Sequence, residues 1–236
     1  MTFRPLLWPS VIAGLGIVIA ISLGMWQLQR LAWKADLLSA MAAARTADPV
    51  PLAAAGAVPW TRVAIRGRFL HPREMHVFAP SRVEGELGVH VVTPFEAEGA
   101  TVLVDRGFVP ERLRDPGARA AGQVDDLMTI TGILRPPAER GAFTPADDPA
   151  RNLWFARDVA AMASASETVN VYPLMVALDQ PVPPGGWPKP VAPDAGIRNP
   201  HLGYAITWFS LAAVLAAVYL AYHAAQGRLG VRRRTA

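Results

Sequence analysis

The chain has 236 residues, of which 52% are hydrophobic and only 18% are charged, whereas a typical soluble domain carries about 25% charged residues. The sequence contains no cysteine, which excludes disulfides, thiolate metal sites, covalent c-type haem attachment and thiol catalysis. The net charge of +4 does not indicate nucleic-acid binding, because every acidic residue lies between two long uncharged stretches and the charged residues of the two tails are all arginines. This distribution is typical of a membrane protein with cytoplasmic tails.

The first uncharged stretch predicts a transmembrane helix at residues 6–28, after a cytoplasmic tail of residues 1–5. Crossing a bilayer takes about 20 mostly apolar residues, and this apolar core is longer than that of a cleaved signal peptide. We therefore expect a retained anchor. Gly14, Gly16 and Gly24 would allow another helix to approach closely.

Beyond the first span, we expect a β-rich domain over residues 29–198. Its first part is rich in Ala and Leu, so the helix should continue over residues 33–44, until the prolines of segment 48–51 stop it. Short β-rich runs separated by Gly, Pro and acidic residues then predict strands. The predicted strands are residues 61–69, 75–78, 89–95, 102–104, 128–134 and 172–178. A short helix is expected at 157–165 and an extended proline-rich linker at 181–193.

Several short strands with few helices favour an α+β fold built on an antiparallel barrel or sandwich. Within it, Asp105 and Arg106, followed by Gly107, are interpreted as the end of a strand that leads into a tight turn. The histidines of this domain show no metal-ligand spacing and are expected on the surface or in the core: His71, His76 and His90. The sequence also lacks a phosphate-binding loop, a zinc-protease helix and a nucleophile elbow, so we expect no enzyme.

The second uncharged stretch predicts a transmembrane helix at residues 199–226, followed by a basic cytoplasmic tail of residues 227–236. Asn199 is a favoured N-cap and Pro200 a favoured first helical residue, so the helix should begin there. Both termini are then cytoplasmic and the β-rich domain is periplasmic, in a multi-pass protein of the cell inner membrane. The two spans would form a transmembrane hairpin.

His201, at the start of the second span, is the strongest candidate for a functional residue. A neutral imidazole is a common metal ligand and haem axial ligand, and ionisable residues within spans are rare. Tyr204 and Trp208 follow on the same helix face, where aromatic rings would suit a flat macrocycle. The alternative is an interfacial histidine among headgroups and aromatic side chains. His223, beside Tyr222 near the inner interface, is interpreted in that way.

Trp26 and Arg30 end the first span at the same expected depth as His201, and Arg198 precedes the second span. If the spans pair, the two arginines would stand near a cofactor held there. Arginine forms bidentate charge-assisted bonds with carboxylates, which is what haem propionates require. The alternative is that these arginines are solvated or bind lipid phosphates.

Four fragments stand in order between the chain ends: Gly24-x-Trp26-Gln27-Leu28-x-Arg30 with Trp33-Lys34; Val102-Leu103-Val104-Asp105-Arg106-Gly107-Phe108-Val109-Pro110; Asn152-Leu153-Trp154-Phe155; and Asn199-x-His201-Leu202-x-Tyr204-Ala205-x-Thr207-Trp208-Phe209. Together they resemble the Surfeit locus protein 1 family of cytochrome c oxidase assembly factors, over nearly the whole chain. One departure is Asp105-Arg106-Gly107-Phe108, where the family more often has Asn-Arg-Gly-Trp.

The resemblance implies that the protein helps to mature the catalytic subunit of a haem–copper oxidase. Bacterial members are regarded as haem a-binding proteins with the histidine of the second span as proposed iron ligand, and His201 stands at that position. Trp26 and Arg30 match the family's pattern in the first span. Haem a would be held non-covalently and transiently, for delivery to the catalytic subunit or its stabilisation. Membrane lipid and the haem a synthesis machinery are further candidate partners.

Two other functions stay open at this point. The chain could be a cofactor-free scaffold, in which the β-rich domain grips the partly built oxidase and the spans only anchor it. It could also be a membrane-anchored periplasmic enzyme that uses Asp105 or His90.

Overall fold

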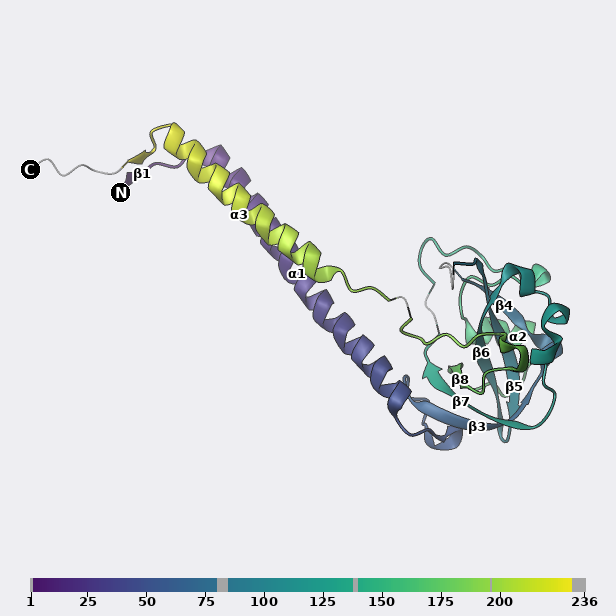
Figure 1. Ribbon diagram of the computed structural model, residues 1–236. Coiled ribbons are helices and arrows are strands. Elements are labelled where there is room, and N and C mark those ends of the chain that lie inside the picture. Colours follow the sequence, from purple (N-terminus) through teal and green to yellow (C-terminus); the bar gives the residue numbers. More distant parts are fainter. Residues whose placement is uncertain (1, 80–84, 138–139, 196, 231–236) are drawn as a thin grey trace, which may run out of the picture. The chain divides into compact units, whose positions relative to one another are not determined.

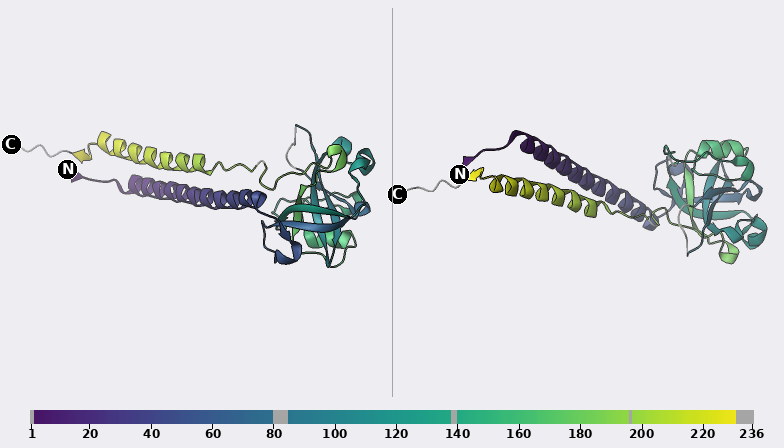
Figure 2. Two further views of the ribbon diagram at one scale, coloured as in Figure 1. Left: turned by 60° about the horizontal axis from the view of Figure 1, so that its bottom comes forward. Right: turned by 90° about the horizontal axis from the view of Figure 1, so that it is seen from above.

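Figure 1 shows the computed structural model of the chain, which describes residues 2–79, 85–137, 140–195 and 197–230. The chain divides into two compact units: Met1–Ser39 with Gly196–Ala236, and Ala40–Ala195. We call the first the helical unit and the second the β-rich unit. Figure 2 gives two further views of each.

The helical unit is an antiparallel pair of long helices, α1 (Leu7–Thr46) and α3 (His201–Ala225). Beside the first residues of α1 and the last residues of α3, β1 (Thr2–Phe3) pairs with β9 (Leu229–Gly230). Both helices are long and apolar enough to cross a membrane, as the sequence predicts. At 1.5 Å per residue, α1 is about 60 Å long, twice the roughly 30 Å hydrocarbon core of a bilayer.

The ends of these helices confirm one prediction and correct another. α1 continues past the first span to Thr46, just before Asp48 and Pro49, because proline lacks the N–H that a helix needs. Asn199, in contrast, is not the N-cap of α3; Pro200 occupies that position. The Asn199 side chain instead donates through Nδ2 to the Leu31 carbonyl oxygen of α1 at 3.2 Å.

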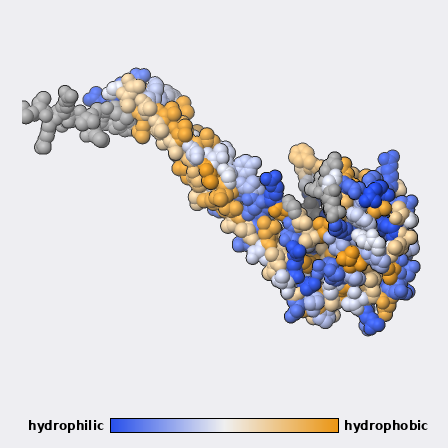
Figure 3. Space-filling view, in the orientation of Figure 1, coloured by the Kyte–Doolittle hydropathy of each residue, from blue (hydrophilic) through white to orange (hydrophobic). Residues whose placement is uncertain are grey.

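The outward-facing surface of both helices is apolar. Ile12 and Val18 of α1, and Leu211 and Val218 of α3, are at least half exposed, and the space-filling view shows hydrophobic side chains along both helices (Figure 3). Soluble proteins rarely expose a continuous apolar surface of this extent, whereas lipid covers it without cost. The chain therefore has the architecture of a two-span membrane protein.

Glycines allow α1 and α3 to approach closely. A Cβ at Gly24 would lie 2.6 Å from the Phe209 ring, and a Cβ at Gly16 would lie 2.7 Å from Leu215 Cδ2. A Cβ at Gly14 would meet nothing within 4 Å. Gly16 and Gly24 thus act as the sequence predicts, whereas Gly14 does not.

The β-rich unit is a closed five-stranded barrel. The strands of the unit are β2 (Val50–Pro51), β3 (Arg62–Phe69), β4 (Met75–Phe78), β5 (Gly88–Ala97), β6 (Ala100–Pro110), β7 (Met128–Arg135) and β8 (Met175–Gln180). They follow the order β2-β3-β7-β8-β6-β5-β4, and an additional β3–β5 pairing closes the ring. The ring itself is formed by β3, β7, β8, β6 and β5. All pairings are antiparallel except β2–β3 and β6–β8. The predicted antiparallel barrel is confirmed, with an unexpected parallel pairing of β6 with β8.

One α-helix and several short 3-10 helices complete this unit. α2 (Val159–Ala165) lies where the sequence predicts it and begins at Asp158, whose side chain accepts a hydrogen bond from the Ala161 N–H at 3.1 Å. The 3-10 helices are η1 (Leu52–Ala54), η2 (His71–Arg73), η3 (Glu111–Leu113), η4 (Pro116–Gly122), η5 (Pro149–Arg151) and η6 (Pro184–Gly186).

The barrel core follows the period-2 pattern of its strands. Val63, Ile65 and Phe69 of β3 are buried with Phe95 of β5 and Val104 of β6 in the main apolar cluster, because alternate side chains of a strand point to the same face. A second cluster fills the space between the sheet and α2. It contains Met75, Val77, Val92, Leu103, Trp154, Val159, Met162 and Met175.

The interpretation of Asp105–Arg106–Gly107 as a turn is wrong. β6 runs through these residues, and its register against β5 shifts by one residue here, which makes Arg106 the extra residue of a β-bulge. Gly107 has φ +112°, and a Cβ there would lie 1.9 Å from the Lys189 carbonyl oxygen. Glycine is needed at this position for the bulge and for the backbone packed against it.

Asp105, on the bulge, is the centre of a buried ion network. His90 Nδ1 lies 3.0 Å from its Oδ1, and Arg157 Nε donates to Oδ2 at 3.0 Å. Arg135 adds a second guanidinium, 3.6 Å from Oδ2. Burial alone would raise the pKa of Asp105, but these neighbours hold it well below its usual range. The carboxylate therefore stays charged, and its loss would leave buried cations unpaired.

Glu74 is the centre of a second buried network. Its Oε1 lies 2.8 Å from His76 Nε2 and also pairs with the Arg119 guanidinium. His76 and His90 thus each pair with a different carboxylate. In the part of the chain that the structure describes, no three His, Cys, Asp or Glu side chains gather into a metal site.

His71 is held neutral by its hydrogen bonds. Arg106 Nη1 lies 3.2 Å from its Nδ1, and a guanidinium can only donate, so Nδ1 is unprotonated. The proton is on Nε2, which donates to the Val124 carbonyl oxygen at 2.9 Å. Burial lowers the pKa of His71 below its ordinary value, and the bond to Val124 only partly opposes this.

We expect Gly24→Ala to destabilise the packing of α1 against α3 by about 1–3 kcal/mol, because the added methyl overlaps the Phe209 ring. Gly14→Ala is the matched control and should be neutral or slightly stabilising, since alanine is the better helix former. Thermal unfolding of both variants in the same non-ionic detergent checks this. Equal unfolding temperatures would show that the helices do not pack through Gly24.

His71 predicts a pH dependence of the stability of the β-rich unit. Below its ordinary pKa of about 6.5 the unfolded chain takes up a proton that folded His71 binds less well, so stability should fall between about pH 7 and pH 5. His71→Asn should make this fall smaller. Tryptophan-fluorescence unfolding at the two pH values measures it, and an unchanged fall in the variant would contradict the assignment.

Candidate functional site between the terminal helices

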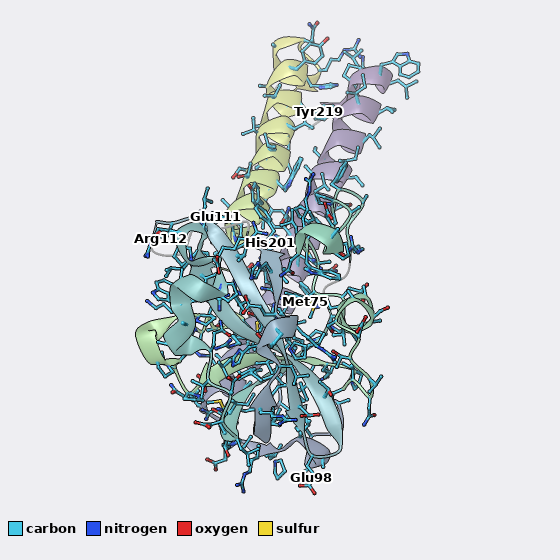
Figure 4. All side chains as sticks on the ribbon, turned by 90° about the vertical axis from the view of Figure 1, so that its right-hand side faces the viewer. Met75, Glu98, Glu111, Arg112, His201 and Tyr219 are labelled. Carbon is cyan, nitrogen blue, oxygen red and sulfur yellow. The ribbon has the colours of Figure 1, made fainter. Side chains whose placement is uncertain are left out.

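His201 faces α1 from the first turn of α3. Its Nδ1 lies 2.7 Å from Oε1 of Gln27, whose side chain is buried between the helices. An amide oxygen only accepts hydrogen bonds, so the imidazole donates its proton from Nδ1. In the neutral imidazole with this tautomer, the lone pair of Nε2 is available to a ligand. Figure 4 labels His201 at this end of α3 and Tyr219 toward the other end.

This arrangement is typical of a metal-ligating histidine. Such a histidine usually donates its second ring N–H to an oxygen acceptor, which fixes the tautomer and the ring orientation. Gln27 supplies that acceptor from the opposite helix. Among residues 2–79, 85–137, 140–195 and 197–230, Nε2 of His201 has no hydrogen-bond partner.

His223 gives a direct contrast within the same hairpin. It is fully buried, its Nε2 accepts the Leu6 N–H at 3.1 Å, and its Nδ1 donates to the Tyr219 carbonyl oxygen at 2.9 Å. Both ring nitrogens are therefore used within the protein. The interpretation of His223 as a histidine of the interfacial aromatic belt is wrong, because it binds an N–H at the start of α1 that has no partner within that helix.

The aromatic residues expected at the site differ in exposure. Tyr204 and Trp26 are 56% and 53% exposed, and Trp208 is half-buried. Ala205, on the same helix face as His201, is buried, so a small residue stands beside the imidazole. The rings of Tyr204 and Trp26 are thus accessible to a group approaching from the lipid.

The arginines expected near a cofactor are both exposed. Arg30 stacks over the Trp33 ring at 3.9 Å from its centroid, a cation–π contact that limits its motion. Arg198 precedes the start of α3. Within the described residues, neither guanidinium forms an ion pair or a side-chain hydrogen bond, so both remain available to anionic groups.

Gln27 is the residue of this site that sequence reasoning missed. A polar amide among apolar residues of a span is a signal in itself, because lipid offers it no hydrogen-bond partner. Asn199 carries a similar signal: its Nδ2 donates to Leu31, but its buried Oδ1 lacks a partner within the described part of the chain. Gln27, Asn199 and His201 thus form a cluster of polar side chains at one end of the hairpin.

Comparisons with known proteins agree with this architecture. A family model described as the SURF1 family matches residues 15–213. A SURF1-like protein of Monosiga brevicollis is 36% identical over 218 residues, which cover 86% of this chain and 83% of the relative.

Two vertebrate proteins are similarly related. Surfeit locus protein 1 of Xenopus tropicalis is 34% identical over 83% of this chain and 69% of its own length, and that of Homo sapiens is 35% identical over 83% and 71%. The region matched by the family model includes both Gln27 and His201. The chain therefore belongs to the SURF1 family.

Proposed function

We propose that the protein is a non-catalytic assembly factor for a haem–copper cytochrome c oxidase. We further propose that it holds haem a at the end of the hairpin where His201 lies. Membership of the SURF1 family supports the assembly role. The observation that carries the haem proposal is the contrast between two histidines: His223 uses both ring nitrogens inside the protein, whereas His201 keeps Nε2 for a ligand.

The residues around His201 suit a haem. His201 Nε2 would coordinate the iron, while Gln27 holds the imidazole in the ligating tautomer. Tyr204 and Trp208 would pack beside the macrocycle, and the exposed guanidiniums of Arg30 and Arg198 would pair with its propionates. When bound, the haem supplies the redox-active iron of the oxidase, and this chain contributes binding, orientation and release.

The charge pattern supports a location in the cell inner membrane, with both termini cytoplasmic and the β-rich unit periplasmic. The expected partners are the catalytic subunit of the oxidase, which receives the haem, and the haem a synthesis machinery, which supplies it. One protein ligand to the iron favours transient binding, since a second protein ligand would slow release.

The first test is an absorption spectrum of the protein purified from cells that make haem a. We expect a haem spectrum in the wild type and in Thr207→Ala, an exposed position of α3, and its loss in His201→Gly, because the axial ligand is gone. Added imidazole should restore the spectrum in His201→Gly by replacing the missing ring. The folded state of each variant is checked by thermal unfolding.

The same variant distinguishes the alternative function. If folded His201→Gly retains the wild-type spectrum, His201 is not the ligand. If neither the wild type nor any variant carries haem, and His201→Gly still supports oxidase assembly in cells, the protein is a cofactor-free scaffold and the hairpin is an anchor.

The second test concerns Gln27 as a positioning residue. Gln27→Leu removes the acceptor of the His201 Nδ1 proton and should weaken haem a binding by about 10–100-fold. Gln27→Glu keeps an acceptor and should bind more tightly than Gln27→Leu. Gln29→Leu, an exposed position two residues away on α1, is the matched control and should bind as wild type. Spectroscopic titration with haem a measures all four proteins; equal affinity of Gln27→Leu and wild type would remove Gln27 from the site.

A further inference from the structure

A small cavity opens at one end of the barrel, inside the β-rich unit. Its volume is about 250 Å³, and it lies between Phe69 at the end of β3, Met128 and Ile130 of β7, Leu178 of β8, and the proline segment 181–184. Nearly all of this lining is apolar. Arg106 is the one charged residue among the described residues that line it.

Arg106 is an unusual group to find there. Its side chain is 2% exposed, and its guanidinium lies 4.7 Å from the centroid of the Phe69 ring. It donates to His71 and to the Gly122 carbonyl oxygen, both uncharged acceptors. Its Nε has no partner within the described part of the chain. A buried charge without a paired anion is costly.

Among the described residues, no carboxylate forms an ion pair with Arg106. Glu74 is the acid that acts most strongly on Arg106, but it is already paired with Arg119 and His76. Burial lowers the pKa of Arg106 to about 10, which still leaves it charged at neutral pH. The cavity is therefore an apolar chamber with one buried, uncompensated guanidinium in its wall.

We propose that this cavity binds a small carboxylate with an apolar body, the carboxylate pairing with Arg106 and the body packing against Phe69, Met128 and Ile130. A carboxylate supplies the missing anion, and its bond to a guanidinium is charge-assisted. Apolar walls exclude hydrophilic anions such as phosphate, which would lose their hydration without replacement.

The volume limits the size of the ligand. The cavity is smaller than the usual 300–1,000 Å³ of drug-sized sites, and it corresponds to about eight water molecules. A six-carbon acid is of this size, whereas a long-chain fatty acid or a haem is not. The site is thus independent of the haem proposal, and neither depends on the other.

Hexanoate is the probe, titrated into the full-length protein in non-ionic detergent and followed by saturation-transfer NMR. We expect saturable binding with a dissociation constant of about 1 mM or below, within reach of a ligand of this size. Hexanamide, the neutral analogue, should bind about tenfold more weakly or not at all, because it lacks the charge. Equal binding of the two compounds, or no binding of hexanoate at about 10 mM, would overturn the proposal.

Two variants test the location. Arg106→Met should abolish hexanoate binding, and Val124→Phe should block it by filling the cavity from the half-buried lining residue Val124. Val169→Phe, at a position 81% exposed, is the control for adding the same ring and should bind as wild type. If Arg106→Met fails to fold, Val124→Phe decides: unchanged binding in that folded variant places hexanoate elsewhere and refutes the site.

Discussion

The structure of the helical unit depends on one constraint: in lipid, polar groups must find their partners within the protein. Cross-helix hydrogen bonds meet this constraint near both ends of the hairpin. At one end the Leu6 N–H binds His223, and Ser10 binds Tyr219. At the other, Gln27 binds His201. Between them, glycines and apolar side chains supply close packing. These polar pairs set the register of the helices. That register brings Gln27 to Nδ1 of His201 and leaves Nε2 without a hydrogen-bond partner among the described residues.

Much of this fold was predictable from sequence because its signals are local. Uncharged stretches, proline stops and period-2 runs placed both helices, most strands and α2 close to their observed bounds. The errors arose where distant residues decide the outcome. Asn199 is a good N-cap by type, but Leu31 of the other helix offers its side chain a partner. Gln27 is 174 positions from the histidine it orients, and nothing local signals that pairing.

The β-rich unit shows the same limit in its electrostatics. The bulge at Arg106 needs a residue with positive φ at Gly107. In the sequence, a glycine after a run of apolar residues indicates a turn as readily as a bulge. Asp105 is contacted by His90, Arg135 and Arg157 from three separate parts of the chain, and Glu74 pairs with Arg119, which is 45 positions away in sequence. Such pairs become visible only when the strands are assembled. The same assembly gives the three histidines of this unit different partners: His76 and His90 contact different carboxylates, and His71 contacts a carbonyl oxygen.

The two ends of the hairpin are held together differently, and His223 holds one of them. Its imidazole ties the first N–H before α1 to the last turns of α3, so separating the helices at that end would strand an amide in a medium that cannot solvate it. At the other end the helices are held by the side-chain amides of Gln27 and Asn199, and the buried Oδ1 of Asn199 has no hydrogen-bond partner within the described part of the chain. Separation of the helices therefore costs more at the His223 end than at the His201 end, and the proposed haem site lies at the end where separation costs less.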